Sequence, residues 1–173
     1  MNSRKHSRNA GFTLVEILIV VVILGILSAI VIPQFTSASD TAKANAMTTQ
    51  LQTIRSQLEL YRVQHGDEYP DLVTTGWDLL TKKTNADHTT TGTPAMGPYL
   101  QKAPSNPVGN SKTIVVIGGT EDAPTAAAGG WAYNNTTGKI LAIVTEAQAT
   151  QLGLSVDDGD IAIAAVVADD DDD

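Results

Sequence analysis

The stretch Asn9-Ala10-Gly11-Phe12-Thr13-Leu14-Val15-Glu16 decides the fold, because it joins a short basic leader to a long apolar run. The leader, residues 1–11, contains three Lys and Arg residues and no acid. The run, residues 12–32, carries a single charge, on Glu16. These 21 residues would extend about 31 Å as a helix, and a bilayer core is about 30 Å thick. The sequence therefore predicts one membrane-spanning helix, which we assign to residues 12–33.

The distribution of basic residues predicts the orientation of this helix. They precede the apolar run, whereas Lys43 is the sole basic residue among the twenty residues that follow it. Such a bias keeps the N-terminus in the cytoplasm and exports the rest of the chain. The alternatives are a cleaved secretory signal, with small residues at Thr36-Ser37-Ala38, and an uncleaved signal anchor. Neither accounts for Glu16 or for the Gly11-Phe12 pair.

The segment Gly11-Phe12-Thr13-Leu14-Val15-Glu16, followed by an apolar helix, resembles the class III signal of type IV pilins and type II secretion pseudopilins. The resemblance implies that a prepilin peptidase cuts between Gly11 and Phe12 and methylates the new amine of Phe12. It also implies a helix-loosening role for Pro33, which sits where many of these proteins have a proline. The implied location is the bacterial inner membrane, with the C-terminal domain in the periplasm.

Glu16 is a candidate functional residue, because a carboxylate at the centre of a membrane helix costs about 2.5–3.5 kcal/mol on insertion scales. The cost is lower four residues from Phe12, since the interface is near and the helix dipole favours an anion in the first turn. A tolerated interfacial glutamate is therefore one interpretation. The resemblance implies another, in which Glu16 pairs with the α-amine of Phe12 on a neighbouring subunit and sets the axial step of a fibre.

An amphipathic pattern continues the helix through residues 34–66. Apolar residues recur at spacings of three and four, which is typical of one buried helix face. These residues are Ala44, Met47, Leu51, Ile54, Leu58 and Tyr61. Gly66 and Pro70 mark the expected end, and the helix from Phe12 to about His65 would be about 80 Å long. We expect Pro33 to kink or locally melt it, because proline removes one backbone hydrogen bond.

The head, residues 67–168, is predicted to contain a small sheet. Short runs rich in β-branched residues, bracketed by turns, indicate strands at 113–117, 131–134, 139–144 and 161–168. The turn residues of 134–138 predict a hairpin between the middle two strands. Within the irregular stretch 69–109, Trp77 and Leu80 are expected to enter the core. The predicted fold is α+β and pilin-like, with the long helix packed on an antiparallel sheet.

Composition restricts the function. The chain has no cysteine, which excludes disulfides and thiol catalysis. Without the leader, 8 Lys and Arg residues stand against 19 Asp and Glu, a formal charge of −11, so direct nucleic-acid binding is not expected. The acidic block 169–173 is predicted to be a disordered tail. His6, His65 and His88 lie in no catalytic motif and are expected at the surface, so we predict no enzymatic activity.

A calcium site is a further candidate, at Asp157-Asp158-Gly159-Asp160. Asp157, Asp158 and Asp160 supply hard carboxylates around a flexible glycine, which suits Ca²⁺. The spacing does not fit an EF-hand, and a plain acidic turn is the alternative. The chain also resembles the G-type pseudopilins, which often bind Ca²⁺ in a loop near the C-terminus, and this resemblance is a second reason to consider a calcium site here. The longer glycine-rich loop of that family is not evident here.

The segment 97–107, Gly-Pro-Tyr-Leu-Gln-Lys-Ala-Pro-Ser-Asn-Pro, resembles the one that introduces the sheet in the major, G-type pseudopilins. We therefore predict a structural subunit of a type II secretion pseudopilus, a helical homo-oligomer. The resemblance implies as partners a prepilin peptidase, an inner-membrane platform protein, an assembly ATPase and minor pseudopilins. The alternatives are a type IV pilin of a surface fibre for adhesion, motility or DNA uptake, and a monomeric membrane-anchored binding domain.

Overall fold

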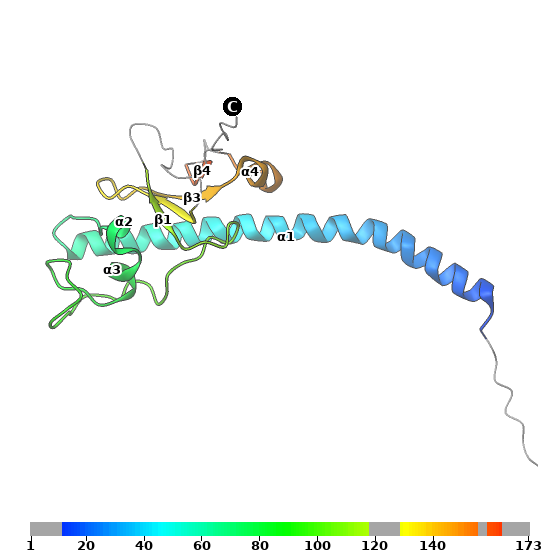
Figure 1. The fold of residues 1–173 in the computed structure, drawn as a ribbon, viewed down its shortest axis with the longest axis horizontal. Coiled ribbons are helices and arrows are strands. Elements are labelled where there is room, and N and C mark those ends of the chain that lie inside the picture. Colours follow the sequence, from blue (N-terminus) through cyan, green and yellow to red (C-terminus); the bar gives the residue numbers. More distant parts are fainter. Residues whose placement is uncertain (1–11, 118–128, 156–158, 164–173) are drawn as a thin grey trace, which may run out of the picture. The chain divides into compact units, whose positions relative to one another are not determined.

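The computed structural model describes residues 12–117, 129–155 and 159–163, and the chain forms two units, residues 1–39 and 40–173. Helix α1, Leu14–Gln64, contains 51 residues and contributes to both units (Figure 1). The leader, the end of the fourth predicted strand and the acidic tail lie outside the described residues. The head has an α+β fold, with the second half of α1 packed on a four-stranded sheet.

The C-terminal end of α1 lies where the glycine signal predicted it. Gly66 and Asp67 both have a φ of +69°, and the Asp67 N–H donates to the carbonyl of Arg62 at 3.0 Å. This bond and the left-handed Gly66 form a Schellman-type ending. The chain is helical through Pro33, and the predicted loosening of the helix at this residue stays a prediction.

The amphipathic stripe forms the helical side of the core, as predicted. Met47, Leu51, Ile54, Leu58 and Tyr61 are all at most 1% exposed. Ala44 is partly exposed at the margin of the stripe. Burial of such side chains contributes about 1.5–3 kcal/mol each, so this face fixes the helix to the head.

The sheet has the order β1-β2-β3-β4. Its strands are β1 Ile114–Val116, β2 Trp131–Tyr133, β3 Ile140–Val144 and β4 Ile161–Ile163. The predicted hairpin is confirmed, because β2 and β3 pair antiparallel. The prediction of an antiparallel sheet throughout was wrong, because β1 pairs with β2, and β4 with β3, in parallel.

A helix explains the parallel pairing of the last two strands. Helix α4, Glu146–Leu152, follows β3 and carries the chain back, so that β4 runs in the same direction as β3. Thr145 begins α4 with a capping box, in which its hydroxyl accepts from the Gln148 N–H and Gln148 Oε1 accepts from the Thr145 N–H. This helix was not predicted from the sequence.

Side chains alternate across β3 between two apolar clusters. Ile140, Ala142 and Val144 join the cluster that contains the buried face of α1. Leu141 and Ile143 join a second, smaller cluster on the other face. All five are buried, so the central strand is covered on both faces.

Two short helices close the core near the C-terminal end of α1: α2, Leu72–Thr75, and α3, Asp78–Thr81 (Figure 1). Trp77 and Leu80 are buried, as predicted. The Trp77 ring meets that of Trp131 edge to face, with centroids 6.4 Å apart. The Trp77 indole N–H donates to the carbonyl of Lys112 at 2.7 Å, so its polar atom is satisfied.

Asn106 connects the segment before β1 to the centre of the sheet. It is fully buried, and its Nδ2 donates to the carbonyls of Gly130 and Ile143 at 2.8 and 2.9 Å. Its Oδ1 accepts from the N–H groups of Val108 and Gly109 at 2.8 and 3.3 Å. One side chain therefore satisfies four backbone groups and holds this segment against the β2–β3 pair.

Candidate functional site

The N-terminal end of α1 is built as a capping box. Glu16 Oε2 accepts from both the N–H and the hydroxyl of Thr13, each at 2.8 Å. The Glu16 N–H in turn donates to Thr13 Oγ1 at 3.3 Å. Thr13 and Glu16 thus occupy the Ncap and N3 positions of the helix, where they satisfy backbone donors that have no partner within it. The signal for this arrangement was the Thr-x-x-Glu spacing.

Glu16 therefore has a local partner within one subunit. Phe12, the predicted first residue of the mature chain, is 78% exposed, and Gly11 lies outside the described residues. Processing between Gly11 and Phe12, and the pairing of Glu16 with a neighbouring Phe12, remain predictions.

The first unit presents a continuous apolar surface. The large apolar side chains between Phe12 and Phe35 are each at least 49% exposed. Among the described residues, α1 is the one helix whose length and composition suit a membrane span. Surface of this extent is stable only when lipid or protein covers it.

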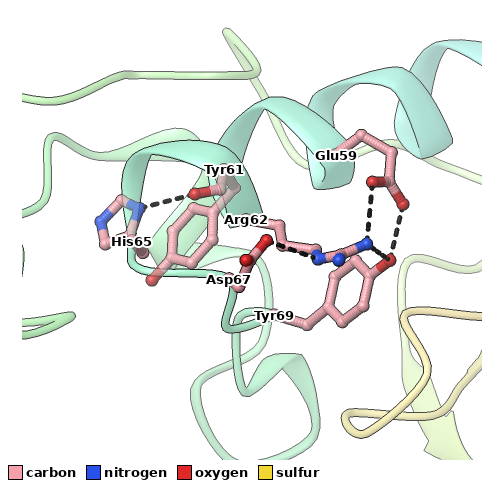
Figure 2. Close-up of polar contacts among 6 residues, drawn as sticks. All are labelled: Glu59, Tyr61, Arg62, His65, Asp67 and Tyr69. Atoms are coloured by element: carbon pink, nitrogen blue, oxygen red, sulfur yellow. Dashed lines mark hydrogen bonds and ion pairs between the residues drawn. The ribbon is translucent and has the colours of Figure 1, made fainter.

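A polar network fixes the other end of α1, as Figure 2 shows. The Tyr69 hydroxyl donates to Glu59 Oε1 at 2.6 Å and accepts from Arg62 Nη1 at 3.2 Å. Arg62 also stacks over the Tyr69 ring at 5.3 Å and pairs through Nε with Asp67 at 3.3 Å. The hydrogen bond that Arg62 donates to Tyr69, with smaller contributions from Asp67 and Glu59, raises the pKa of Arg62. Tyr69 is thereby held against the last turns of the helix.

His65 and His88 do not lie free at the surface, contrary to expectation. His65 is 4% exposed, stacks on the Tyr61 ring at 3.8 Å and has its Nδ1 2.9 Å from the carbonyl of Tyr61 (Figure 2). Its Nε2 lies 3.0 Å from Thr84 Oγ1. A carbonyl only accepts, so the contact with Tyr61 requires a hydrogen on Nδ1, and in that tautomer Nε2 accepts from the Thr84 hydroxyl. His65 continues the spacing of the apolar stripe by four residues, which was the signal missed.

His88 connects the same helix to the following loop. Its Nδ1 lies 2.7 Å from the Tyr61 hydroxyl and its Nε2 3.1 Å from Glu68 Oε2. Burial, with smaller contributions from Tyr99 and Glu68, raises the pKa of Tyr61. Every polar atom of this group has a structural partner, and this arrangement indicates packing of the loop on α1 and not catalysis.

Of the three candidate calcium residues, Asp160 is the one that lies among the described residues, so the predicted site remains a prediction. Asp160 Oδ1 lies 2.7 Å from Arg55 Nη1, and Asp157 and Asp158 lie outside the described residues. Within the described part of the chain, no three His, Asp or Glu side chains form a group that could hold a metal ion.

Comparison with known proteins agrees with this geometry. The model of the prokaryotic N-terminal methylation motif matches residues 6–32, and that of type II secretion system protein G matches residues 34–144. The type II secretion system core protein G of Vibrio cholerae is 31% identical over 137 residues, 78% of this chain and 91% of that protein. That of Pseudomonas aeruginosa is 38% identical over 106 residues, 61% and 72% of the two chains.

One pilin is also similar. The type IV major pilin protein PilA of Myxococcus xanthus is 39% identical over 69 residues, which are 40% of this chain and 31% of that protein. No solved structure matches the chain significantly.

A capped, exposed apolar helix that continues into the core of a small α+β head defines the pilin-like class of proteins. Within that class, the chain belongs to the type II secretion system protein G family, because the family model covers more than half of it. It is a pseudopilin, a structural and non-enzymatic protein. Its prepilin-type motif implies peptidase processing and pseudopilus assembly.

Proposed function

We propose that the chain is stored in the inner membrane through residues 12–33 and, after cleavage between Gly11 and Phe12, is extracted into a pseudopilus that drives protein export. The observation that carries this proposal is the contrast within α1. One face of its second half, from Met47 to Tyr61, is buried in the head, whereas the large apolar side chains described in its first half are exposed to solvent. A subunit of this kind has a head with its own buried core and an anchor helix whose apolar surface needs lipid or protein to cover it.

The free energy of burying apolar side chains favours direct transfer of this helix from the lipid bilayer into the fibre. Each buried apolar side chain gains about 1.5–3 kcal/mol relative to water, and the exposed part of α1 carries many of them. Burial among the helices of a fibre replaces burial in lipid, so transfer between the two avoids exposure to water. The membrane orientation with a cytoplasmic leader follows the basic residues before the span.

The partners proposed for this cycle follow from its steps. A prepilin peptidase hydrolyses the Gly11-Phe12 peptide bond, which releases residues 1–11, and transfers one methyl group from a methyl donor to the new amine of Phe12. An assembly ATPase and an inner-membrane platform protein supply the work of extraction, and minor pseudopilins complete the fibre.

Glu16 has two roles in this proposal. In the stored subunit its carboxylate accepts from Thr13, and that pairing satisfies it near the membrane interface. In the fibre it pairs with the charged amine of Phe12 on the neighbouring subunit. A charged amine is a stronger partner than a hydroxyl, so the exchange favours assembly.

Deletion of the gene in its host tests whether the chain serves protein secretion or forms a surface fibre. We expect the culture supernatant to lose exported enzymes while surface fibres, seen by electron microscopy, stay unchanged. Loss of fibres with normal secretion would make the chain a surface pilin and contradict the proposal. Mass spectrometry of the mature N-terminus tests processing separately: the chain should begin at methylated Phe12, and an intact Gly11-Phe12 bond would point to a monomeric anchored domain.

A further inference from the structure

Arg55 gathers three oxygen atoms at the beginning of β4. Its Nη1 donates to Asp160 Oδ1 at 2.7 Å, and its Nη2 donates to the carbonyls of Gly159 and Ile140 at 2.9 and 3.0 Å. The Arg55 side chain is 36% exposed and that of Asp160 is 25% exposed, so the pair lies at the margin of the core. One guanidinium thus joins α1, the first residue of β3 and the turn that precedes β4.

The position of this contact gives it a role in docking the last strand. The carbonyl of Asp160 accepts from the Ala142 N–H at 2.9 Å, which begins the pairing of β4 with β3. Gly159 has a φ of +69° and turns the chain into this pairing. On the helix side, the Arg55 guanidinium donates to the Gly159 carbonyl and the Asp160 carboxylate. On the sheet side, the Ala142 N–H donates to the Asp160 carbonyl.

The three acceptors are the kind that a calcium ion would use. Ca²⁺ takes carboxylate and backbone carbonyl oxygens, and Arg55 already uses one Asp160 oxygen and the Gly159 carbonyl. A planar guanidinium, with several N–H groups in a fixed fork, satisfies three such acceptors at once. A divalent ion bound to the same carboxylate would lie close to this fixed positive charge and be repelled by it. Asp160 therefore does not fit a calcium site while Arg55 holds it.

We propose that Arg55 positions the Gly159-Asp160 turn for β4 to dock and, by occupying the Asp160 carboxylate, makes the folded head independent of calcium. Helix α1 thus supplies, from within the chain, the positive charge that pairs with Asp160. A lysine at this position would keep the charge but present a single nitrogen, and so would not bridge the two carbonyls and the carboxylate in the same way.

Thermal unfolding of the full processed chain in detergent micelles, with EDTA or with about 5 mM calcium, tests the proposal. We expect the Tm of the wild type to be the same in both conditions. Arg55→Gln should lower the Tm by about 3 °C or more in both, and Arg55→Lys should recover only part of the loss. Lys102→Gln is the matched control, because it removes the same charge from an exposed site elsewhere in the head and should leave the Tm unchanged.

A double-mutant cycle and hydrogen exchange separate this role from general packing. Asp160→Asn should also lower the Tm, and the double variant Arg55→Gln/Asp160→Asn should lose less than the sum of the two single changes. Amide protection should fall at residues 161–163 and at Ala142 before it falls in the helix. An increase of several degrees in the wild-type Tm on adding calcium, or an unchanged Tm in Arg55→Gln, would overturn the proposal.

Discussion

The ring of Tyr69 lies directly against Gly138: a Cβ on Gly138 would overlap Tyr69 Cε1. Gly138 has a φ of +70° and belongs to the turn between β2 and β3. Through its hydroxyl, Tyr69 is bound to Glu59 and Arg62 of α1. The Tyr69 ring therefore connects the turn between β2 and β3 to the C-terminal end of α1. Because the ring lies so close to the backbone at position 138, that position requires glycine.

Gly138→Ala should destabilise the head by about 2–4 kcal/mol, because it adds a steric overlap to the cost of a positive φ. Gly153→Ala is the matched control: its φ is +65°, but nothing lies within 4 Å of the added Cβ. It should cost only about 1 kcal/mol. Urea unfolding measures both. In a Tyr69→Ala background the cost of Gly138→Ala should approach that of the control, and equal costs in the wild-type background would contradict this account.

Asn106→Ala should destabilise the head by about 2–3 kcal/mol, because the buried carbonyls of Gly130 and Ile143 lose their donor. Asn135→Ala is the control, since Asn135 is exposed and loses one surface hydrogen bond to Asp71. It should change the free energy of unfolding by less than about 0.5 kcal/mol. Similar values for the two variants in urea unfolding would show that Asn106 contributes no more than a surface amide.

The head should lose stability at alkaline pH. Burial raises the pKa of Tyr61, Tyr99 and Tyr133 above the usual value of about 10. These phenols stay protonated in the folded state while the unfolded chain releases its protons. Stability is therefore complete below about pH 9 and falls as the pH rises through 10 and beyond, by up to about 1.4 kcal/mol per pH unit for each tyrosine.

Tyr61→Phe isolates one of these contributions. The variant loses the hydrogen bond to His88 at all pH values, but the slope of stability against pH above 10 should decrease by about 1.4 kcal/mol per unit. Urea unfolding at a series of pH values measures the slope. An unchanged slope would mean that Tyr61 ionises as readily in the folded head as in the unfolded chain.

Features with a local signal could be predicted from the sequence. The apolar periodicity of α1 placed Met47 to Tyr61 in the core, and Gly66 marked the end of the helix. The span of α1 was predicted because length and hydropathy alone define it. The N-terminal motif led to the family because it combines several residue types at fixed spacing.

Features that depend on distant partners were missed. Asp40 is buried because Gln151, on a helix 111 residues later, donates to its Oδ2 at 2.7 Å. Nothing near Asp40 in the sequence signals this contact. The parallel pairing of β4 was missed for a related reason: it depends on α4, whose capping box at Thr145 was visible in the sequence but not used.

Glu16→Ala should leave the chain inserted and processed but abolish filament assembly, because it removes the charge that we propose pairs with Phe12 of a neighbour. Thr13→Val is the control that separates this role from capping: it removes the hydroxyl bonded to Glu16 and keeps the carboxylate. If pairing between subunits is the essential role, the Thr13 variant assembles and the Glu16 variant does not. Electron microscopy of filaments, with membrane fractionation and N-terminal mass spectrometry, distinguishes the cases. Loss of filaments in both variants would assign the defect to the helix start, and filaments of normal abundance from Glu16→Ala would refute the pairing.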